Sequence, residues 1–261
     1  MELEIKKTNP IKDLDSWFKY AEPKGGKSQW KEGRSAMEFA RYMTEYKGKM
    51  PEAIHRYLES IDFKDKYTCL PEETTSFKGK DLGTGEGRHH DGLLVSKNYL
   101  IGIEAKVSES FDYSLQKKIA IAEKKNSDGG NNTRKRIVNS LKMIKPDFKE
   151  ELLESKDVQK LMYQLISGTV GSIIEARERS IKKAAFLVIE FTGDVYKEKN
   201  YEEHVKKNQA DYDAFLDFLE LSNKPDEERY ITLDNGDLRV YFNKIQVNIS
   251  CVKSSYQYLS K

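Results

Sequence analysis

Residues 86–107, EGRHHDGLLVSKNYLIGIEAKV, contain the stretch that decides the fold. Two runs rich in Leu, Ile and Val, near 89–95 and 99–107, flank the polar pair Lys97-Asn98. Short apolar runs on either side of a two-residue polar turn are typical of an antiparallel hairpin. We therefore expect two paired strands here, buried because their residues are mostly apolar.

The register of this hairpin decides which side chains meet. A turn at Lys97-Asn98 places Asp91 directly opposite Glu104. Opposed residues lie about 5 Å apart at Cβ, and side chains alternate between the two faces of a strand. Lys106 therefore projects from the same face as Glu104. Two carboxylates and one lysine are expected to converge.

Two carboxylates this close repel each other unless a proton or a cation lies between them. Mg²⁺ suits the position because it takes one or two carboxylates and keeps several waters. Asp91 and Glu104 are the expected ligands, with the carbonyl of Ala105 as a further one. Lys106 would orient or help to deprotonate the attacking water. A simpler interpretation stays open, because an E-x-K pattern on a strand is more often an exposed ion pair.

The segments before the hairpin predict two helices and a strand. Apolar residues recur at helical spacing from Ser35 to Met43, and Pro51 should begin a second helix. A strand is expected to open at 67–70. The connection 81–88, DLGTGEGR, is glycine-rich and is interpreted as a flexible loop that could close over substrate.

The segments after the hairpin begin with a helical insertion at 108–156. It should contain helices at 115–125 and 133–144, separated by the polar turn NSDGGNN. The strongest helix prediction is 157–179, which is apolar on more than one side and is expected between layers. The run 184–191, AAFLVIEF, is typical of a central strand covered on both faces.

The two ends of the chain complete this organisation. Residues 1–33 are expected to be irregular, and 205–251 should form a helix followed by a hairpin that turns at Asn235-Gly236. The order helix, three strands, helix and strand predicts an α/β fold with a mixed central sheet flanked by helices. We expect a single domain over residues 1–261.

Composition restricts the function classes. The chain has 45 basic and 43 acidic residues, so binding to nucleic acid would need a local basic patch rather than a global field. Its two cysteines, Cys69 and Cys251, are far apart, which favours the reducing cytoplasm over a disulfide framework. No secretory leader and no apolar run of about 18 residues is present, so no membrane association is expected.

The spacing of Asp91 and Glu104-Ala105-Lys106 resembles the PD-(D/E)XK nuclease superfamily. Three further patterns extend the likeness to a little-characterised bacterial branch: W-x-x-G-R-S-A-x-E at 30–38, E-x-K-V-x-E-x-F at 104–111 and Y-Q-L-x-x-x-x-x-G at 163–171. The resemblance covers about residues 30–192. It departs from the superfamily pattern in that a histidine, and not a proline, precedes Asp91.

This resemblance implies a restriction-endonuclease-like core in the order αβββαβ, interrupted by the helical insertion. It implies cleavage of phosphodiester bonds with Mg²⁺ or Mn²⁺, with DNA as the expected substrate and an endonuclease as the expected enzyme. Many members that cut duplex DNA do so as dimers, so a homodimer is open. The alternative is a catalytically inactive member that binds nucleic acid or a protein partner. A weaker third hypothesis is hydrolysis of a small phosphoester.

The resemblance also implies roles for residues outside the hairpin. Glu38 matches an acid that assists the metal, although a helix acid favoured by the N-terminal dipole is an equal alternative. Gln164 matches a polar residue beside the site, and its alternative is an amide bonded to backbone. Glu72 or Glu73 could approach from the first strand, and neither is assigned a role.

Basic residues and histidines complete the set of candidates. Arg34 is a candidate phosphate contact. Arg134, Lys135 and Arg136 could follow a nucleic-acid backbone, although a solvated helix face is more common. His89-His90 does not predict a zinc site, because adjacent strand residues point to opposite faces.

Overall fold

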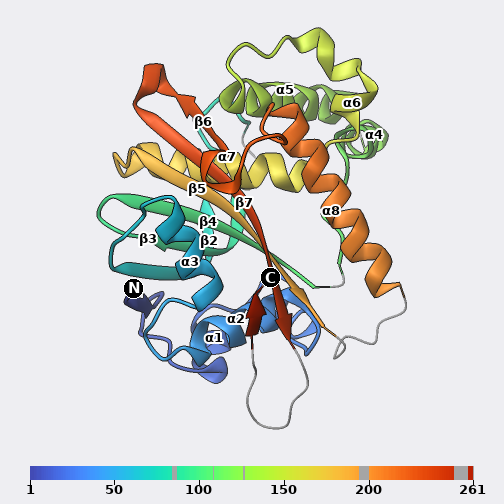
Figure 1. The fold of residues 1–261 in the computed structure, drawn as a ribbon. Helices are drawn as coiled ribbons and strands as arrows, with labels where there is room; N and C mark the ends of the chain where they lie inside the picture. The colour runs from blue at the N-terminus through green and yellow to red at the C-terminus, as the bar shows by residue number, and fades with distance from the viewer. Residues whose placement is uncertain (84–86, 108, 126, 194–199, 250–257, 261) are drawn as a thin grey trace.

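The computed structural model describes residues 1–83, 87–107, 109–125, 127–193, 200–249 and 258–260. These residues form an α/β fold with one mixed sheet (Figure 1). The strand order is β1-β2-β3-β4-β5-β7-β6, and β8 pairs with β7 beside this path. The strands are β1 (Leu3–Ile5), β2 (Tyr67–Thr75), β3 (Arg88–Val95), β4 (Tyr99–Lys106), β5 (Lys183–Thr192), β6 (Tyr230–Leu233), β7 (Leu238–Ile249) and β8 (Tyr258–Ser260).

The central hairpin has the predicted turn. The Ser96 amide donates to the Tyr99 carbonyl at 2.9 Å, which closes the turn at Lys97-Asn98. Gly92 then pairs with Ile103, and the regular ladder ends there, one residue before Asp91 and Glu104 on their strands. β4 pairs antiparallel with β3 and parallel with β5, so the hairpin lies in the middle of the sheet.

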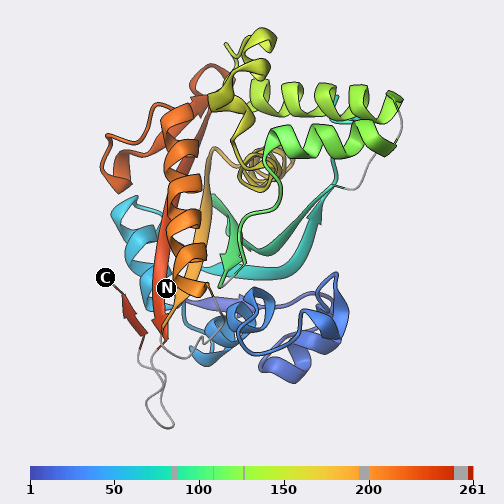
Figure 2. The ribbon, with the colours of Figure 1, turned by 90° about the vertical axis from the view of Figure 1, so that its right-hand side faces the viewer.

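Helices cover both faces of the sheet. They are α1 (Leu14–Tyr20), α2 (Ser35–Glu45), α3 (Glu52–Ser60), α4 (Leu115–Lys125), α5 (Ser127–Ile144), α6 (Lys156–Gln159), α7 (Tyr163–Glu178) and α8 (Tyr201–Phe218). The first three lie on one face, and α7 is seen end-on between the other face and the helices α4 and α5 (Figure 2). Each face has its own apolar core because strand side chains alternate.

The positions of α2 and α7 follow from their sequences. Phe39 of α2, Ile54 of α3 and Ile103 of β4 are buried in the same apolar core on one face. α7 is apolar all round and lies between two layers, as predicted. Gly168 lets it approach β5 closely, because a Cβ atom there would lie 2.4 Å from the Phe186 ring.

The predicted helix 157–179 is wrong in one respect, because the chain breaks between α6 and α7. At the break the Leu161 carbonyl accepts from the Leu115 amide at 2.9 Å. The Tyr163 amide donates to the Tyr113 carbonyl at 3.0 Å. These long-range backbone hydrogen bonds replace helical ones, and periodicity does not reveal them.

The predicted turn NSDGGNN is also wrong, because α5 begins at Ser127 and includes most of it. Residue 126 lies outside the described residues. Glycine and asparagine disfavour helices only weakly, and tertiary packing overrides that preference. Farther along α5, Ile137, Leu141 and Ile144 are buried in the core, and this packing stabilises the helix.

The two ends of the chain contribute more to the fold than expected. Residues 1–33 contain β1 and α1, and α1 has a capping box between Asp13 and Ser16 and a buried Trp17. The C-terminal hairpin contains β7, which pairs with β5 over ten residues, Lys183–Thr192. The sheet therefore extends beyond the 30–192 core that the resemblance covers.

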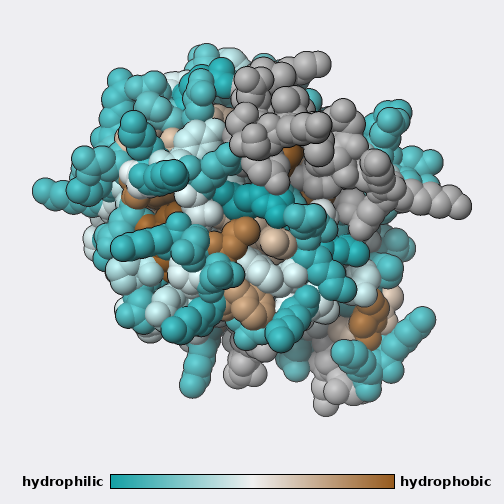
Figure 3. Space-filling model, turned by 90° about the horizontal axis from the view of Figure 1, so that it is seen from below, coloured by the Kyte–Doolittle hydropathy of each residue, from teal (hydrophilic) through white to brown (hydrophobic). Residues whose placement is uncertain are grey.

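The face of the molecule below the sheet in Figure 1 is mainly polar. The molecule seen from below is mostly hydrophilic, and outside the atoms drawn in grey its hydrophobic residues form small separate groups (Figure 3). Within the described residues, no helix is both long enough and apolar enough to cross a membrane.

Candidate active site

A cavity of about 410 Å³ opens beside the hairpin. Asp91, Glu104, Lys106 and Gln164 all line it, together with Arg34. The structure thus brings the four predicted catalytic residues and one predicted phosphate contact to a single cavity. The lining also includes ionisable residues that had no assigned role, among them Glu72, Arg88 and Glu109.

Asp91 is held against the neighbouring strand. Its Oδ2 accepts a hydrogen bond from the Ala105 amide at 2.7 Å. Burial raises the pKa of Asp91, while Lys106 and this amide oppose the rise. The Ala105 side chain itself is buried in the core on the α2 side of the sheet. The contact fixes the Asp91 carboxylate beside the end of β4.

The regular alternation of side chains between the two faces of the sheet is interrupted in β3 at Asp91. A Cβ atom on Gly92 would lie 2.7 Å from Phe39 of α2, on one face. Yet His90, only two residues earlier, faces Gly171 of α7 on the other face. Residues two apart in a regular strand share a face, so β3 is irregular at Asp91. Glu72, at the matching position of β2, has a left-handed φ of 49°.

Glu104 is enclosed by cations. Lys106 Nζ lies 2.8 Å from Oε1, and the Arg88 guanidinium pairs with Oε2. The Glu104 side chain is only 2% exposed and that of Lys106 only 6%. Burial lowers the pKa of Lys106, while Asp91 and Glu109 oppose this. A carboxylate this buried needs such partners, because leaving it unpaired would be costly.

Glu72 and Glu109 complete the acidic part of the cavity. Burial raises the pKa of Glu72 to about 8, and the nearby Asp91 adds to the rise. Glu109 accepts from the Ser35 amide and from the Val107 amide, each at 3.2 Å. It therefore connects the start of α2 to the end of β4.

Gln164 and Glu38 differ in their relation to the cavity. Gln164, in the first turn of α7, lines the cavity while its Oε1 accepts from the Asp112 amide at 3.1 Å. Glu38 is not part of the lining that the described residues form. Its carboxylate accepts from the Gly33 amide at 2.9 Å and pairs with Arg41 at 3.0 Å. These bonds hold the loop before α2.

The basic residues of the insertion are also separate from the cavity lining in the described part of the chain. Arg134 pairs with Glu123 at 3.4 Å and with Glu154 at 2.5 Å. The Arg136 guanidinium lies 5.0 Å from the Phe77 ring centroid. Lys135 is exposed on α5. Arg134 is thus occupied by acids of the same insertion.

Sequence reasoning gave Arg88 and Glu109 no role, for different reasons. Arg88 and Asp91 are three apart on one strand, so regular alternation would place them on opposite faces. The reversal at Asp91 is what brings both to the cavity. Glu109 was visible only as a position of the E-x-K-V-x-E-x-F pattern. Within the glycine-rich loop 81–88, residues 84–86 lie outside the described residues, as does Cys251.

The donor set suits a hard divalent cation. In the described part of the chain, no three His, Cys, Asp or Glu side chains form a preformed metal cage. Mg²⁺ does not require one, since one or two carboxylates with waters and phosphate oxygens suffice. Asp91 and Glu104 offer that number on adjacent strands. Burial raises the pKa of Asp91 and of Glu72, although Arg88 opposes the rise at both groups.

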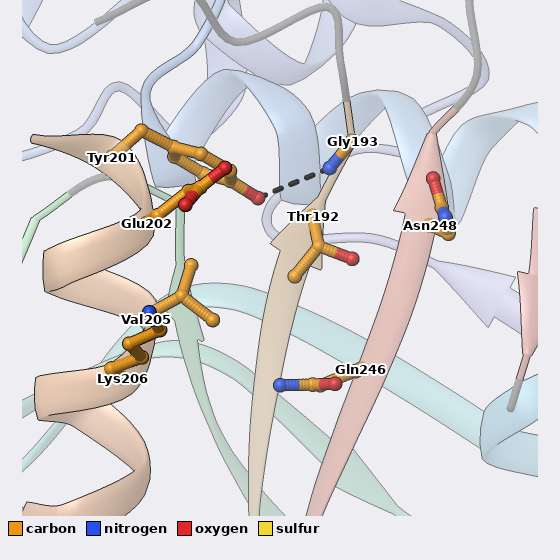
Figure 4. A pocket seen from close by; sticks show the side chains of 8 residues that line it. All are labelled: Thr192, Gly193, Tyr201, Glu202, Val205, Lys206, Gln246 and Asn248. Carbon is orange, nitrogen blue, oxygen red and sulfur yellow. Dashed lines mark hydrogen bonds between the residues drawn. The ribbon is translucent and has the colours of Figure 1, made fainter. Parts of the chain in front are cut away.

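A second cavity of about 340 Å³ lies between α8 and the ends of β5 and β7 (Figure 4). The Tyr201 hydroxyl accepts from the Gly193 amide at 3.0 Å, and Gln246 donates to the buried Glu190 at 3.1 Å. Glu190 also pairs with Lys244 at 2.7 Å. Among the described residues, the lining of this cavity has one acid, Glu202, and one lysine, Lys206, and no pair of acids.

Comparison with known proteins identifies a family whose function is unknown. The model of DUF6946, a domain of unknown function, matches residues 10–254, and the chain belongs to this family. No curated protein and no solved structure matches the chain.

Proposed function

We propose that this protein is a metal-dependent phosphodiesterase with a restriction-endonuclease-like core, and that it acts as a DNA endonuclease. The observation that carries the proposal is the single cavity lined by Asp91, Glu104, Lys106 and Gln164. The acids and the lysine come from adjacent strands of one buried hairpin. That arrangement is the one expected from the resemblance to PD-(D/E)XK nucleases.

Each residue of the site has a definite part in such a reaction. Asp91 and Glu104 would hold Mg²⁺ or Mn²⁺, with the Ala105 carbonyl as a further ligand. When bound, the cation would supply a water of lowered pKa and a polarised phosphate. Lys106, with its pKa lowered by burial, would orient that water and offset negative charge in the transition state. Arg34 and Gln164 would contact the phosphate or the water from the cavity wall.

The test is cleavage of plasmid and of single-stranded and duplex oligonucleotides with Mg²⁺ or Mn²⁺. We expect Asp91→Asn and Lys106→Met to reduce cleavage at least about 100-fold, the usual range for a lost acid–base group. Lys182→Met is the matched control, because Lys182 is exposed and pairs with Asp237 outside the cavity. Unchanged cleavage in both site variants would exclude the assignment.

The second candidate is a catalytically inactive member of the fold that binds nucleic acid or a protein partner. One observation favours it: both Glu104 oxygens are already engaged by cations. Calorimetry with Mg²⁺ and Mn²⁺ separates the two functions. Absence of metal binding in the wild type, with no change in Glu104→Gln, would support the inactive module.

A further inference from the structure

Arg88, the first residue of β3, contacts Glu104 of the neighbouring strand. Its guanidinium pairs with Glu104 Oε2, and its side chain is 10% exposed. Its Nε is buried and has no hydrogen-bond partner among the described residues. Buried donors are nearly always paired in native proteins. Arg88 therefore brings an unused donor as well as a positive charge to the cavity.

The fold makes room for this arginine. A Cβ atom on Gly171 of α7 would lie 3.0 Å from Arg88 Cγ and 2.6 Å from His90 Nε2. Any larger residue at 171 would push against the Arg88 stem. Glycine also weakens a helix interior, so its presence here is explained by the space that Arg88 and His90 need.

Glu104 cannot serve Arg88 and a divalent cation with the same oxygen. Lys106 occupies Oε1 from the same strand, and Arg88 occupies Oε2 from the neighbouring strand. A cation at Oε2 would lie next to the guanidinium, and like charges at such distances repel strongly in a buried site. Metal binding at Oε2 of Glu104 therefore requires Arg88 to leave this oxygen.

We propose that Arg88 occupies Oε2 of Glu104 in the metal-free protein, yields it to the divalent cation, and then binds the phosphate of the substrate. The inference rests on the proposed function and adds a coupling between metal loading and phosphate capture. A guanidinium matches phosphate geometry and keeps its charge in a buried site. The phosphate would enter the same cavity, since Mg²⁺ shares the oxygens of its substrate.

The experiment measures Mn²⁺ affinity by calorimetry without nucleic acid, and separately the cleavage of duplex DNA at saturating Mn²⁺. Wild type is compared with Arg88→Met, Arg88→Lys and Glu104→Gln. We expect Arg88→Met to bind Mn²⁺ about tenfold more tightly, because a competing cation is gone, and to cleave at least about tenfold more slowly. Arg88→Lys should lie between, and Glu104→Gln should bind Mn²⁺ more weakly than wild type.

The opposite signs of these two effects distinguish the proposal from a structural role, which would weaken both metal binding and cleavage. Unchanged or weaker Mn²⁺ binding in Arg88→Met would overturn it. Unchanged cleavage in Arg88→Met would overturn the proposed contact between Arg88 and the phosphate. If thermal denaturation shows Arg88→Met unfolded, the Arg88→Lys affinity decides, and a value equal to wild type overturns the proposal.

Failure of the proposed function is recognised separately. Suppose that the wild type cleaves no DNA while Arg88→Met binds Mn²⁺ more tightly. This result would exclude the nuclease function and the phosphate contact. Arg88 would still be the cation that competes with the metal. A wild type that cleaves DNA, with unchanged Mn²⁺ affinity in Arg88→Met, would exclude only the inference about Arg88.

Discussion

At the residue scale, Glu72 has an unusual backbone conformation beside the site. Its φ of 49° is uncommon for a residue with a side chain, and it lies at the position of β2 that matches Asp91 on β3. Unusual backbone of this kind persists only where the surroundings impose it. Here Lys7 Nζ donates to the Glu72 carbonyl at 2.6 Å and to the Pro71 carbonyl at 3.0 Å. These bonds hold the backbone at Glu72, whose side chain lines the cavity.

The raised pKa of Glu72 predicts a pH dependence of stability. Burial and Asp91 raise this pKa to about 8 from 4.5. Between these values the folded protein binds more protons than the unfolded chain, so the free energy of unfolding decreases as pH rises from about 4.5 to 8. One such proton contributes a slope of up to about 1.4 kcal/mol per pH unit. We expect Glu72→Gln to reduce the decrease, measured by urea unfolding at pH 5, 6.5 and 8.

Glu73→Gln is the control for this measurement, because Glu73 is the neighbouring residue and pairs with Lys7 at 3.6 Å. It should retain the wild-type slope. The same slope in wild type and Glu72→Gln would show that Glu72 does not hold the proton.

At the scale of elements, α7 and the hairpin act as one unit. α7 packs across β3, β4 and β5, and its glycines set how closely it approaches. Gly168 faces the Phe186 ring of β5, and Gly171 faces Arg88 and His90 of β3. The first turn of α7 also brings Gln164 to the cavity. The position of this helix therefore determines the shape of the site.

Gly171→Ala tests this dependence. Helix propensity alone predicts that alanine stabilises a helix by about 1 kcal/mol. The added Cβ would lie 2.6 Å from His90 Nε2, so we expect a net loss of about 1–3 kcal/mol from overpacking. Chemical denaturation measures the change. A variant at least as stable as wild type would show that α7 can shift without cost.

At the scale of the whole molecule, the sheet is continuous from β1 to β7. β7 pairs with β5 along Lys183–Thr192, and α8 buries Tyr212, Phe215 and Leu216 in the core on the α7 side. The segment 30–192 thus contains β4 but lacks β7, the second of the two strands that pair with β5. We therefore expect the whole chain, and not this segment, to be the folding unit.

Truncation tests that conclusion. A fragment of residues 1–192 should fail to fold, because the free edge of β5 and the apolar surface under α8 would be exposed. A chain ending at residue 249 should fold, since β8 adds only three paired residues. Limited proteolysis and near-ultraviolet circular dichroism compare the two. A cooperative thermal transition in the 1–192 fragment would contradict the expectation.

Local sequence patterns determined several elements directly. The polar pair Lys97-Asn98 between apolar runs set the hairpin turn, and AAFLVIEF set the buried strand β5. Helical spacing from Ser35 to Met43 located α2. These predictions are confirmed because each element's signal lies within its own residues.

Only the tertiary structure decided the rest. The break before α7, the central place of β7 and the reversal at Asp91 all depend on contacts between residues distant in sequence. Side-chain alternation could bring Glu104 and Lys106 together, because they lie on one regular strand. Alternation alone does not predict the contact between Arg88 and Glu104. That contact depends on the irregular geometry of β2 and β3 at Glu72 and Asp91.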